Sequence, residues 1–399
     1  MRTVFKRLPY TIRGNNMNRW EKVIISFFCI TSLVVNTTGC STIASKTQSP
    51  SVNANSKAPN NESNSTVSIL PDQIHMFDEQ NGYGRSDDAV MVTSNGGATW
   101  TNVTPQMPGD GPGPSVTGYF VNAQTGWTFR LQPEKSITIY GTHDGGQSWS
   151  QLAIMPVKNG DGGMSVAFSD ARRGWFEDLT AGNAQLGGEL FATNDGGKTW
   201  QCMADSSRQG NLPFGGELTA QRDGTLWLSG GQRAGIMGGP GFVWLYRSTN
   251  GGQTWSQVNL PLSTVQKKET TSASAPVFFG KNGFVTVQFQ GDSVLYANQD
   301  GSQTWSVRGT LKPESWLVFA DAMSGWQVTS SGQIYSTKDG GRAWQPLPVN
   351  PILQKALAGR LIDQVDFVDS HKGWLVLTSG DVNLLLVTKD GGLRWSEVD

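Results

Sequence analysis

Short apolar stretches alternate with polar, glycine-containing turns along most of the chain, from about residue 67 to its end. Val116–Phe120 shows the pattern: this apolar stretch is followed by a short polar turn and then by Gly126-Trp127. Short apolar runs bounded by such turns are typical of β-strands. The same Gly-aromatic step recurs at Gly82-Tyr83, Gly174-Trp175, Gly283-Phe284, Gly325-Trp326 and Gly373-Trp374, with a looser version at Trp227.

An eight-residue box follows each of these steps, and seven copies are present. Its third position is Asp or Asn, glycine follows, and tryptophan closes it. The carboxylate or amide can accept hydrogen bonds from the backbone that follows, and the glycine allows positive φ, so each box predicts a tight hairpin turn. We therefore interpret the Asp residues as turn formers rather than catalytic or metal-binding groups. The copies are 93–100 (TSNGGATW), 142–149 (THDGGQSW), 193–200 (TNDGGKTW), 248–255 (STNGGQTW), 298–305 (NQDGSQTW), 337–344 (TKDGGRAW) and 388–395 (TKDGGLRW).

The repeating unit is four short strands, with a period of roughly 40 to 55 residues that is typical of β-propellers. Twelve of the 15 tryptophans fall at two repeat positions, where large rings can fill the space between sheets. The sequence predicts an all-β fold, a seven-bladed β-propeller of four-stranded antiparallel blades, over residues 67–399. No extra strand is evident for an interlocked closure, so we expect the first blade to pack directly on the seventh.

The N-terminal segment predicts that the protein is located outside the cytoplasm. The apolar run Val23–Val35 follows the basic residues Arg19 and Lys22, as in a secretory signal peptide, and is short for a membrane span. Thr38-Gly39-Cys40-Ser41 resembles a bacterial lipobox, so we predict a signal peptide over residues 1–39 and a lipid anchor at Cys40. An ordinary signal peptide is the alternative, and translation starts at Met1 or at Met17. Residues 40–66 are rich in Ser and Asn and predict a flexible tether.

Composition excludes several kinds of partner and chemistry. Charged residues make up 16% of the chain, its net charge is -1, and no basic stripe outside the N-terminus suits nucleic acid. The three histidines, His75, His143 and His371, are scattered, and no metal-binding or phosphate-loop motif is present. We therefore expect no nucleic-acid partner, no metal and no cofactor, and we expect a monomer.

The loops on the two faces of the predicted disc differ in length. The first turn of each blade and its box should share one face, and these turns are short and uniform. The longest and most variable loops should lie on the opposite face, which in repeat proteins is often the binding face. We predict that a partner binds there, around the central channel; the alternative is that the candidates are ordinary solvated residues. The candidates are Asp110, Arg130, Glu177, Arg233, Lys268 and Trp316.

The Gly-Trp step combined with the T-x-D-G-G-x-T-W box resembles the Asp-box (BNR) repeat superfamily, most closely the photosystem II stability/assembly factor-like propellers. That resemblance implies a non-enzymatic, extracytoplasmic module that binds another protein or a cell-envelope polysaccharide. Sialidases and some endoglucanases share the repeat, so a glycoside hydrolase is the alternative. Sialidases need an arginine cluster, and Phe129-Arg130-Leu131-Gln132-Pro133 departs from their Phe-Arg-Ile-Pro motif by one extra residue and by its place after a box. An endoglucanase needs two carboxylates across a cleft.

Overall fold

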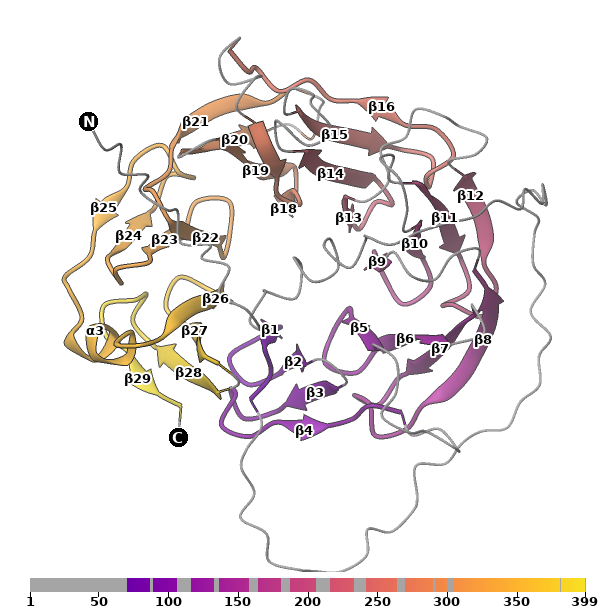
Figure 1. Cartoon of the computed structure of the whole chain (residues 1–399), viewed down its shortest axis with the longest axis horizontal. Helices are drawn as coiled ribbons and strands as arrows, with labels where there is room; N and C mark the ends of the chain where they lie inside the picture. The colour runs from indigo at the N-terminus through magenta and orange to yellow at the C-terminus, as the bar shows by residue number, and fades with distance from the viewer. Residues whose placement is uncertain are drawn as a thin grey trace, which may run out of the picture.

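A computed structural model describes residues 70–86, 89–105, 116–132, 136–157, 164–180, 187–205, 216–232, 242–263, 270–289, 292–299, 301, 304–380 and 382–398. These residues form seven antiparallel sheets arranged in a ring (Figure 1). Each sheet consists of strands that are consecutive in the sequence, which we name A to D from the ring axis outwards. The predicted seven-bladed β-propeller is confirmed.

The strands are short, as the spacing of the turns requires. Blade 1 contains β1 (Gln73–Met76), β2 (Gly82–Arg85), β3 (Val90–Thr93) and β4 (Thr101–Asn102); blade 2 contains β5 (Val116–Phe120), β6 (Gly126–Gln132), β7 (Ser136–Thr142) and β8 (Ser150–Pro156); blade 3 contains β9 (Met164–Phe168), β10 (Gly174–Thr180), β11 (Gly187–Thr193) and β12 (Gln201–Asp205); blade 4 contains β13 (Glu217–Ala220), β14 (Leu226–Gln232), β15 (Phe242–Ser248) and β16 (Ser256–Gln257). Blade 5 contains β17 (Thr270–Ala273), β18 (Val277–Phe279), β19 (Asn282–Phe289), β20 (Ser293–Asn298) and β21 (Ser306–Thr310); blade 6 contains β22 (Ser315–Phe319), β23 (Gly325–Thr329), β24 (Ile334–Thr337) and β25 (Gln345–Pro346); blade 7 contains β26 (Leu361–Phe367), β27 (Gly373–Ser379), β28 (Val382–Thr388) and β29 (Ser396–Glu397).

Blade 5 departs from the four-strand prediction because its A strand is divided in two. Both β17 and β18 pair with β19, and Ser274–Pro276 lies between them. Proline has no N–H to donate to a neighbouring strand, so it ends regular pairing at this point. The Ser274 hydroxyl takes over part of that pairing by accepting a hydrogen bond from the Thr286 N–H at 3.0 Å.

One short helix, α3 (Pro351–Ala356), lies between blades 6 and 7 and was not predicted. Asn350 caps it by accepting a hydrogen bond from the Leu353 N–H at 2.9 Å, and Pro351 occupies the first turn, where its missing N–H costs nothing. The pair Asn350-Pro351 was therefore a signal in the sequence for the start of this helix.

Each regular box is closed by its own side chains, as blade 2 illustrates. The Thr142 hydroxyl donates to the Asp144 carboxylate at 2.7 Å and accepts from the Gly146 N–H at 2.9 Å. The carboxylate also accepts from the Ser148 N–H at 2.9 Å, while Gly145 and Gly146 adopt positive φ. Partial burial acts to raise the Asp144 pKa, but the hydrogen bonds from Ser148 and Thr142 outweigh it and leave the pKa below its ordinary value. The predicted turn role of the box carboxylates is confirmed.

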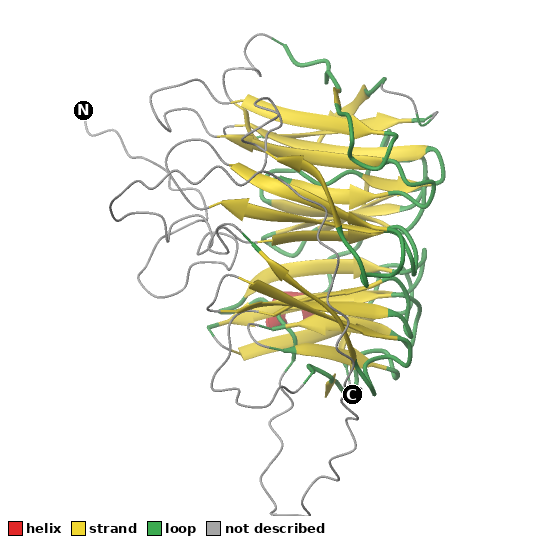
Figure 2. Cartoon of the chain, turned by 90° about the vertical axis from the view of Figure 1, so that its right-hand side faces the viewer, coloured by secondary structure: helices red, strands yellow, loops and turns green. Residues whose placement is uncertain are grey.

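The first turn of each blade and its box lie on the same face, as predicted. In six blades the first glycine N–H of the box donates to a carbonyl of the A–B turn, for example from Gly96 to Gln80 at 2.8 Å and from Gly391 to His371 at 2.8 Å. Most of the described loops gather on this face of the disc (Figure 2). We call it the box face. The most variable B–C and D–A loops lie outside the described residues.

Indole groups connect neighbouring blades. The B-strand tryptophan of one blade donates its ring N–H to a glycine carbonyl in the box of the next blade at four joints. Two of these rings also stack on the last phenylalanine of the next A strand, Trp127 on Phe168 at 3.6 Å between ring centres and Trp326 on Phe367 at 3.8 Å. Tryptophan suits this position because it has a large apolar body and one donor that can be satisfied inside the protein.

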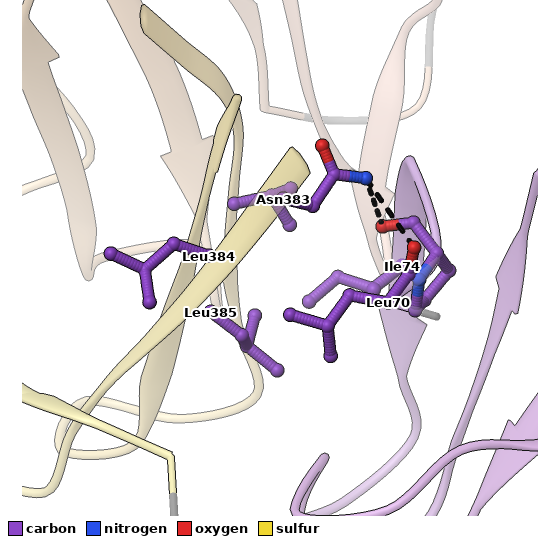
Figure 3. A pocket seen from close by; sticks show the side chains of 7 residues that line it. Leu70, Ile74, Asn383, Leu384 and Leu385 are labelled. Atoms are coloured by element: carbon purple, nitrogen blue, oxygen red, sulfur yellow. Dashed lines mark hydrogen bonds between the residues drawn. The ribbon is translucent and has the colours of Figure 1, made fainter. Parts of the chain in front are cut away.

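Among the described strands, none is shared between the first and last blades of the ring. At the joint between blades 7 and 1, Trp374 donates to the Gly96 carbonyl at 2.9 Å, and the Gln364 amide exchanges two hydrogen bonds with the backbone of Ile74. Figure 3 shows the Asn383 amide directed at the Leu70 and Pro71 carbonyls beside an aliphatic pocket. That pocket is too small to hold a water molecule, so it is a packing feature rather than a ligand site. Direct packing of blade 1 on blade 7, as expected, closes the ring.

Candidate binding surface

Three of the six predicted partner-binding residues lie among the described residues. Arg130 is in β6 and is 7% exposed, Glu177 is in β10 and is 1% exposed, and Trp316 is half-buried in β22. The other three, Asp110, Arg233 and Lys268, lie outside the described residues, as does the predicted lipid-anchor residue Cys40.

Arg130 and Glu177 lie in different joints of the ring. Arg130 is directly opposite Val116, whose side chain belongs to the core between blades 1 and 2. Glu177 is directly opposite Leu190, which packs in the core between blades 3 and 4. Residues that face each other across neighbouring strands point to the same side of a sheet. The structure therefore does not bring these two side chains together.

Trp316 packs at a third joint. It lies against the core that blades 6 and 7 share, beside Val318 and Leu384. Much of this side chain therefore serves packing between blades. Its remaining exposed part stays a candidate contact for a partner.

Blade 3 holds a row of buried carboxylates that sequence reasoning missed. Asp178, Glu189 and Asp205 lie directly opposite one another on β10, β11 and β12, with exposed fractions of 3%, 6% and 4%. They share a side of the sheet with Phe176, which packs against blade 2. Directly opposite side chains lie about 5 Å apart at Cβ, so these carboxylates are close neighbours. Asp178 stands four residues after the glycine of its Gly-Trp step, the same position at which Arg130 was selected from the sequence. The pairing of Asp178 with Glu189 and Asp205 is visible only from the strand register.

The A strands surround the ring axis, and we call them together the axial wall (Figure 1). Their described residues carry three carboxylates and one imidazole, and none of them is Lys or Arg. These four residues are His75, Glu217, Asp363 and Asp366. The described axial wall is therefore acidic, although the net charge of the whole chain is close to zero.

The carboxylates of the axial wall are held in place by neighbouring blades. Glu217 in blade 4 accepts a hydrogen bond from the Ala275 N–H of blade 5 at 2.8 Å, where the divided A strand leaves that N–H free of ladder pairing. Asp366 in blade 7 accepts from the Met76 N–H of blade 1 at 2.8 Å. Both side chains reach solvent but are surrounded by protein, as expected for groups that line the axis of a ring.

All three carboxyl groups of the axial wall have a raised pKa. Burial raises the pKa of Glu217, and the hydrogen bond from Ala275 only partly offsets it. Burial also raises the pKa of Asp366, against the opposing effect of the His75 imidazole and the backbone N–H groups. For Asp363, burial and the nearby Asp72 carboxylate act in the same direction on the pKa. A cationic group placed beside any one of these carboxyl groups would favour its ionised form.

Two further classes of site are absent from the described ranges. No three His, Cys, Asp or Glu side chains there lie close enough to hold a metal ion. Within the same ranges, no helix has the length and hydropathy required to cross a bilayer.

Comparison with known proteins supports the repeat and the fold. The BNR/Asp-box repeat model matches residues 246–257, which include the fourth box. No curated protein matches the sequence. A solved structure of YCF48 bound to a D1 peptide is 19% identical with a TM-score of 0.51, and the match covers 79% of this chain and 92% of that one.

Two larger enzymes contain a similar propeller. A structure from an analysis of two prolyl endopeptidases is 8% identical with a TM-score of 0.51, and the match covers 82% of this chain and 49% of that one. An ancestral GH74 enzyme is 14% identical with a TM-score of 0.50, and the match covers 83% of this chain and 46% of that one. The chain therefore spans about half the length of each enzyme. At these identities the similarity concerns the fold, which does not by itself fix a function. The chain is a seven-bladed β-propeller with the fold seen in YCF48, and its fourth box matches the BNR/Asp-box repeat.

Proposed function

We propose that the chain is an extracytoplasmic lipoprotein, anchored through Cys40, whose propeller binds a segment of another protein without catalysing a reaction. The segment enters at the face opposite the box face, where we predict Asp110, Arg233 and Lys268 to lie, and its cationic groups contact the axial wall.

The charge of the axial wall carries this proposal. Glu217, Asp363 and Asp366 all contribute carboxylates, and the described A strands supply no Lys or Arg to neutralise them. Such a wall attracts a polypeptide with lysine, arginine or a free amino terminus and repels acidic sugars. Sialosides and uronate polymers are therefore poor ligands for this surface. The YCF48 structure, which contains a bound D1 peptide, is consistent with peptide binding by a propeller of this fold.

Glycoside hydrolysis is the second candidate, because blade 3 places carboxylates side by side. Directly opposite positions on neighbouring strands give separations close to the roughly 5 to 9.5 Å used by glycosidases. Asp178, Glu189 and Asp205 nevertheless lie between sheets with at most 6% of each side chain exposed. A glycosidase must hold the sugar between its two carboxylates, so this burial favours a structural role.

Binding of defined peptides to the full chain tests the proposal. A set of extended peptides of equal length, carrying Lys and Arg, neutral residues, or Asp and Glu, is titrated by fluorescence anisotropy at low and physiological salt. We expect the basic peptides to bind most tightly, with affinity that falls as salt rises. The same preparation is assayed on fluorogenic sialosides and β-glucans.

A matched pair of variants identifies the surface. Glu217→Gln keeps an acceptor for the Ala275 N–H but removes the charge, and we expect it to weaken basic-peptide binding several-fold. Glu397→Gln removes an exposed carboxylate from the outermost strand of blade 7 and should leave binding unchanged. Equal affinity for all three peptide classes, or an equal effect of the two variants, would contradict peptide binding by the axial wall. Turnover of a glycoside would overturn the non-enzymatic assignment.

A further inference from the structure

Two arginines on neighbouring blades converge on one oxygen atom. Arg308 lies in β21, the outermost strand of blade 5, and Arg342 lies in the box of blade 6. With its amide oxygen turned towards them, Gln299 accepts from Nη2 of Arg308 at 2.7 Å and from Nη2 of Arg342 at 2.8 Å. The two guanidinium groups therefore lie within hydrogen-bond reach of the same point, although both are cationic.

Gln299 accepts one hydrogen bond from each guanidinium but carries no charge. Among the described residues, Asp339 is the acid that acts on both arginines. Its carboxylate already accepts from the backbone N–H groups of Arg342 and Ala343 and from the Thr337 hydroxyl. Arg342 reaches only the Asp339 backbone carbonyl, at 2.9 Å. Burial and the Arg342 charge lower the pKa of Arg308, and its buried Nε has no hydrogen-bond partner among the described residues.

Other arginines on the box face are neutralised by carboxylates in their own turns. Arg394 in the box of blade 7 donates from Nε to Asp390 at 2.7 Å, and Arg173 in the A–B turn of blade 3 donates to Asp170 at 2.7 Å. Each of these two guanidinium groups therefore has a carboxylate of its own turn beside it. Arg308 and Arg342 share a neutral amide instead, and among the described residues the acid that acts on both of their charges is Asp339. One carboxylate balances only one of these two positive charges.

We propose that Arg308 and Arg342 form a binding site for a phosphate or sulfate group, with Gln299 occupying the anion position in the free protein. Guanidinium groups bind such oxyanions through charge-assisted hydrogen bonds, which are stronger than bonds to a neutral amide. A dianion balances the two charges better than a single carboxylate. The site lies at the joint of blades 5 and 6, apart from the axial wall, and is independent of the proposed peptide binding.

Calorimetric titration of the full chain with inorganic phosphate tests the site, with glycerol phosphate, sulfate and acetate as separate arms. We expect one saturable phosphate site that sulfate occupies in competition, with acetate at least tenfold weaker. Binding of glycerol phosphate as well would identify an esterified phosphate as the source, whereas binding of inorganic phosphate alone would identify the free ion. Acetate binding as tight as phosphate binding would contradict the ligand class.

Three variants assign the site to these residues. Arg342→Gln, on an exposed side chain, should weaken phosphate binding at least tenfold, and Gln299→Glu should abolish it while raising the thermal midpoint, because an internal carboxylate then occupies the position. The matched control, Arg394→Gln, removes an arginine that has its own carboxylate and should leave phosphate binding unchanged. Absence of saturable phosphate binding, or equal losses in Arg342→Gln and Arg394→Gln, would overturn the proposal.

Discussion

The joint between blades 7 and 1 and the joint between blades 4 and 5 are held together by different residues. At the first joint, the Trp374 indole donates to a box carbonyl of blade 1, and Gln364 and Asp366 bond to the backbone of β1. At the second, the Trp227 indole donates to Gln221 of its own blade at 3.2 Å, and its ring is tilted against Phe278 instead of stacked.

The difference between the two joints follows how closely the box of the second blade keeps the repeated sequence. The box of blade 1 keeps both glycines, whereas the box of blade 5 has Asn298 at its first position and Ser302 in place of the second glycine. An indole from the preceding blade needs the box carbonyl at a fixed place, and an irregular box does not offer it. Glu217 supplies a substitute link across the second joint by accepting from Ala275. The joint that closes the ring is thus one of the four that keep an indole bond to a box carbonyl of the next blade.

The largest effect should come from disturbing the box of blade 1. Gly97 has a φ of +91°, and a Cβ there would meet the Leu385 side chain of blade 7 at 2.7 Å. We expect Gly97→Ala to destabilise the protein by about 2–4 kcal/mol through backbone strain and overpacking. Chemical denaturation measures the change. Gly309→Ala in blade 5 has open space around the new methyl group and should change stability by less than about 0.5 kcal/mol. Similar losses in both variants would show that the loss in Gly97→Ala does not come from the packing of the blade 1 box on blade 7.

A smaller effect should separate the two indoles. Trp374→Phe leaves the Gly96 carbonyl without its partner in a buried setting, which we expect to cost about 1–3 kcal/mol. Trp227→Phe loses a bond to a partly exposed glutamine that water can replace, so its hydrogen-bond cost should be about 1 kcal/mol or less. Both variants lose the same ring volume, so the difference between their unfolding free energies reports the link between blades. A larger loss for Trp227→Phe would contradict the comparison.

The smallest effect concerns the pH dependence of the joint between blades 7 and 1. The pKa of Asp366 is raised above its ordinary value of 3.8, so the folded protein favours the protonated carboxyl group. The stability that this group contributes is therefore complete below about pH 4 and is lost as the pH rises through the raised pKa. Asp366→Asn keeps an acceptor for the Met76 N–H and removes the titration. We expect this variant to gain stability relative to the wild type between pH 4 and pH 7, measured by urea midpoints.

Asp390, whose pKa is shifted in the opposite direction, provides the control for that measurement. Burial acts to raise the Asp390 pKa, but hydrogen bonds from Arg394 and Thr388 outweigh it, so the pKa is lowered. Its contribution is present above about pH 4 and is lost as the pH falls through the lowered value. Asp390→Asn should therefore lose stability relative to the wild type as the pH rises from below that value to neutrality. If both variants changed in the same direction, the raised pKa of Asp366 would be wrong.

The repeat made most of the fold predictable. Glycine bends and tryptophan anchors depend on residues a few positions apart, so the spacing of Thr142, Asp144 and Gly146 was enough to assign them to one turn. Seven such turns fix the number of blades, and the absence of a spare strand in the repeat correctly indicated direct closure. The divided A strand at Pro276 and the helix after Asn350 were also encoded locally, although neither was predicted.

The location of charged side chains was decided by tertiary structure. Arg130 and Glu177 were predicted to share a binding surface, but the side of a sheet that each faces depends on strand register, which places them in joints on opposite sides of blades 2 and 3. The convergence of Arg308 and Arg342 likewise depends on the packing of two blades. The sequence alone determined the local turns and how often they recur, because those are short-range effects. Only the closed ring decided which distant charges meet, because that depends on how separate sheets pack.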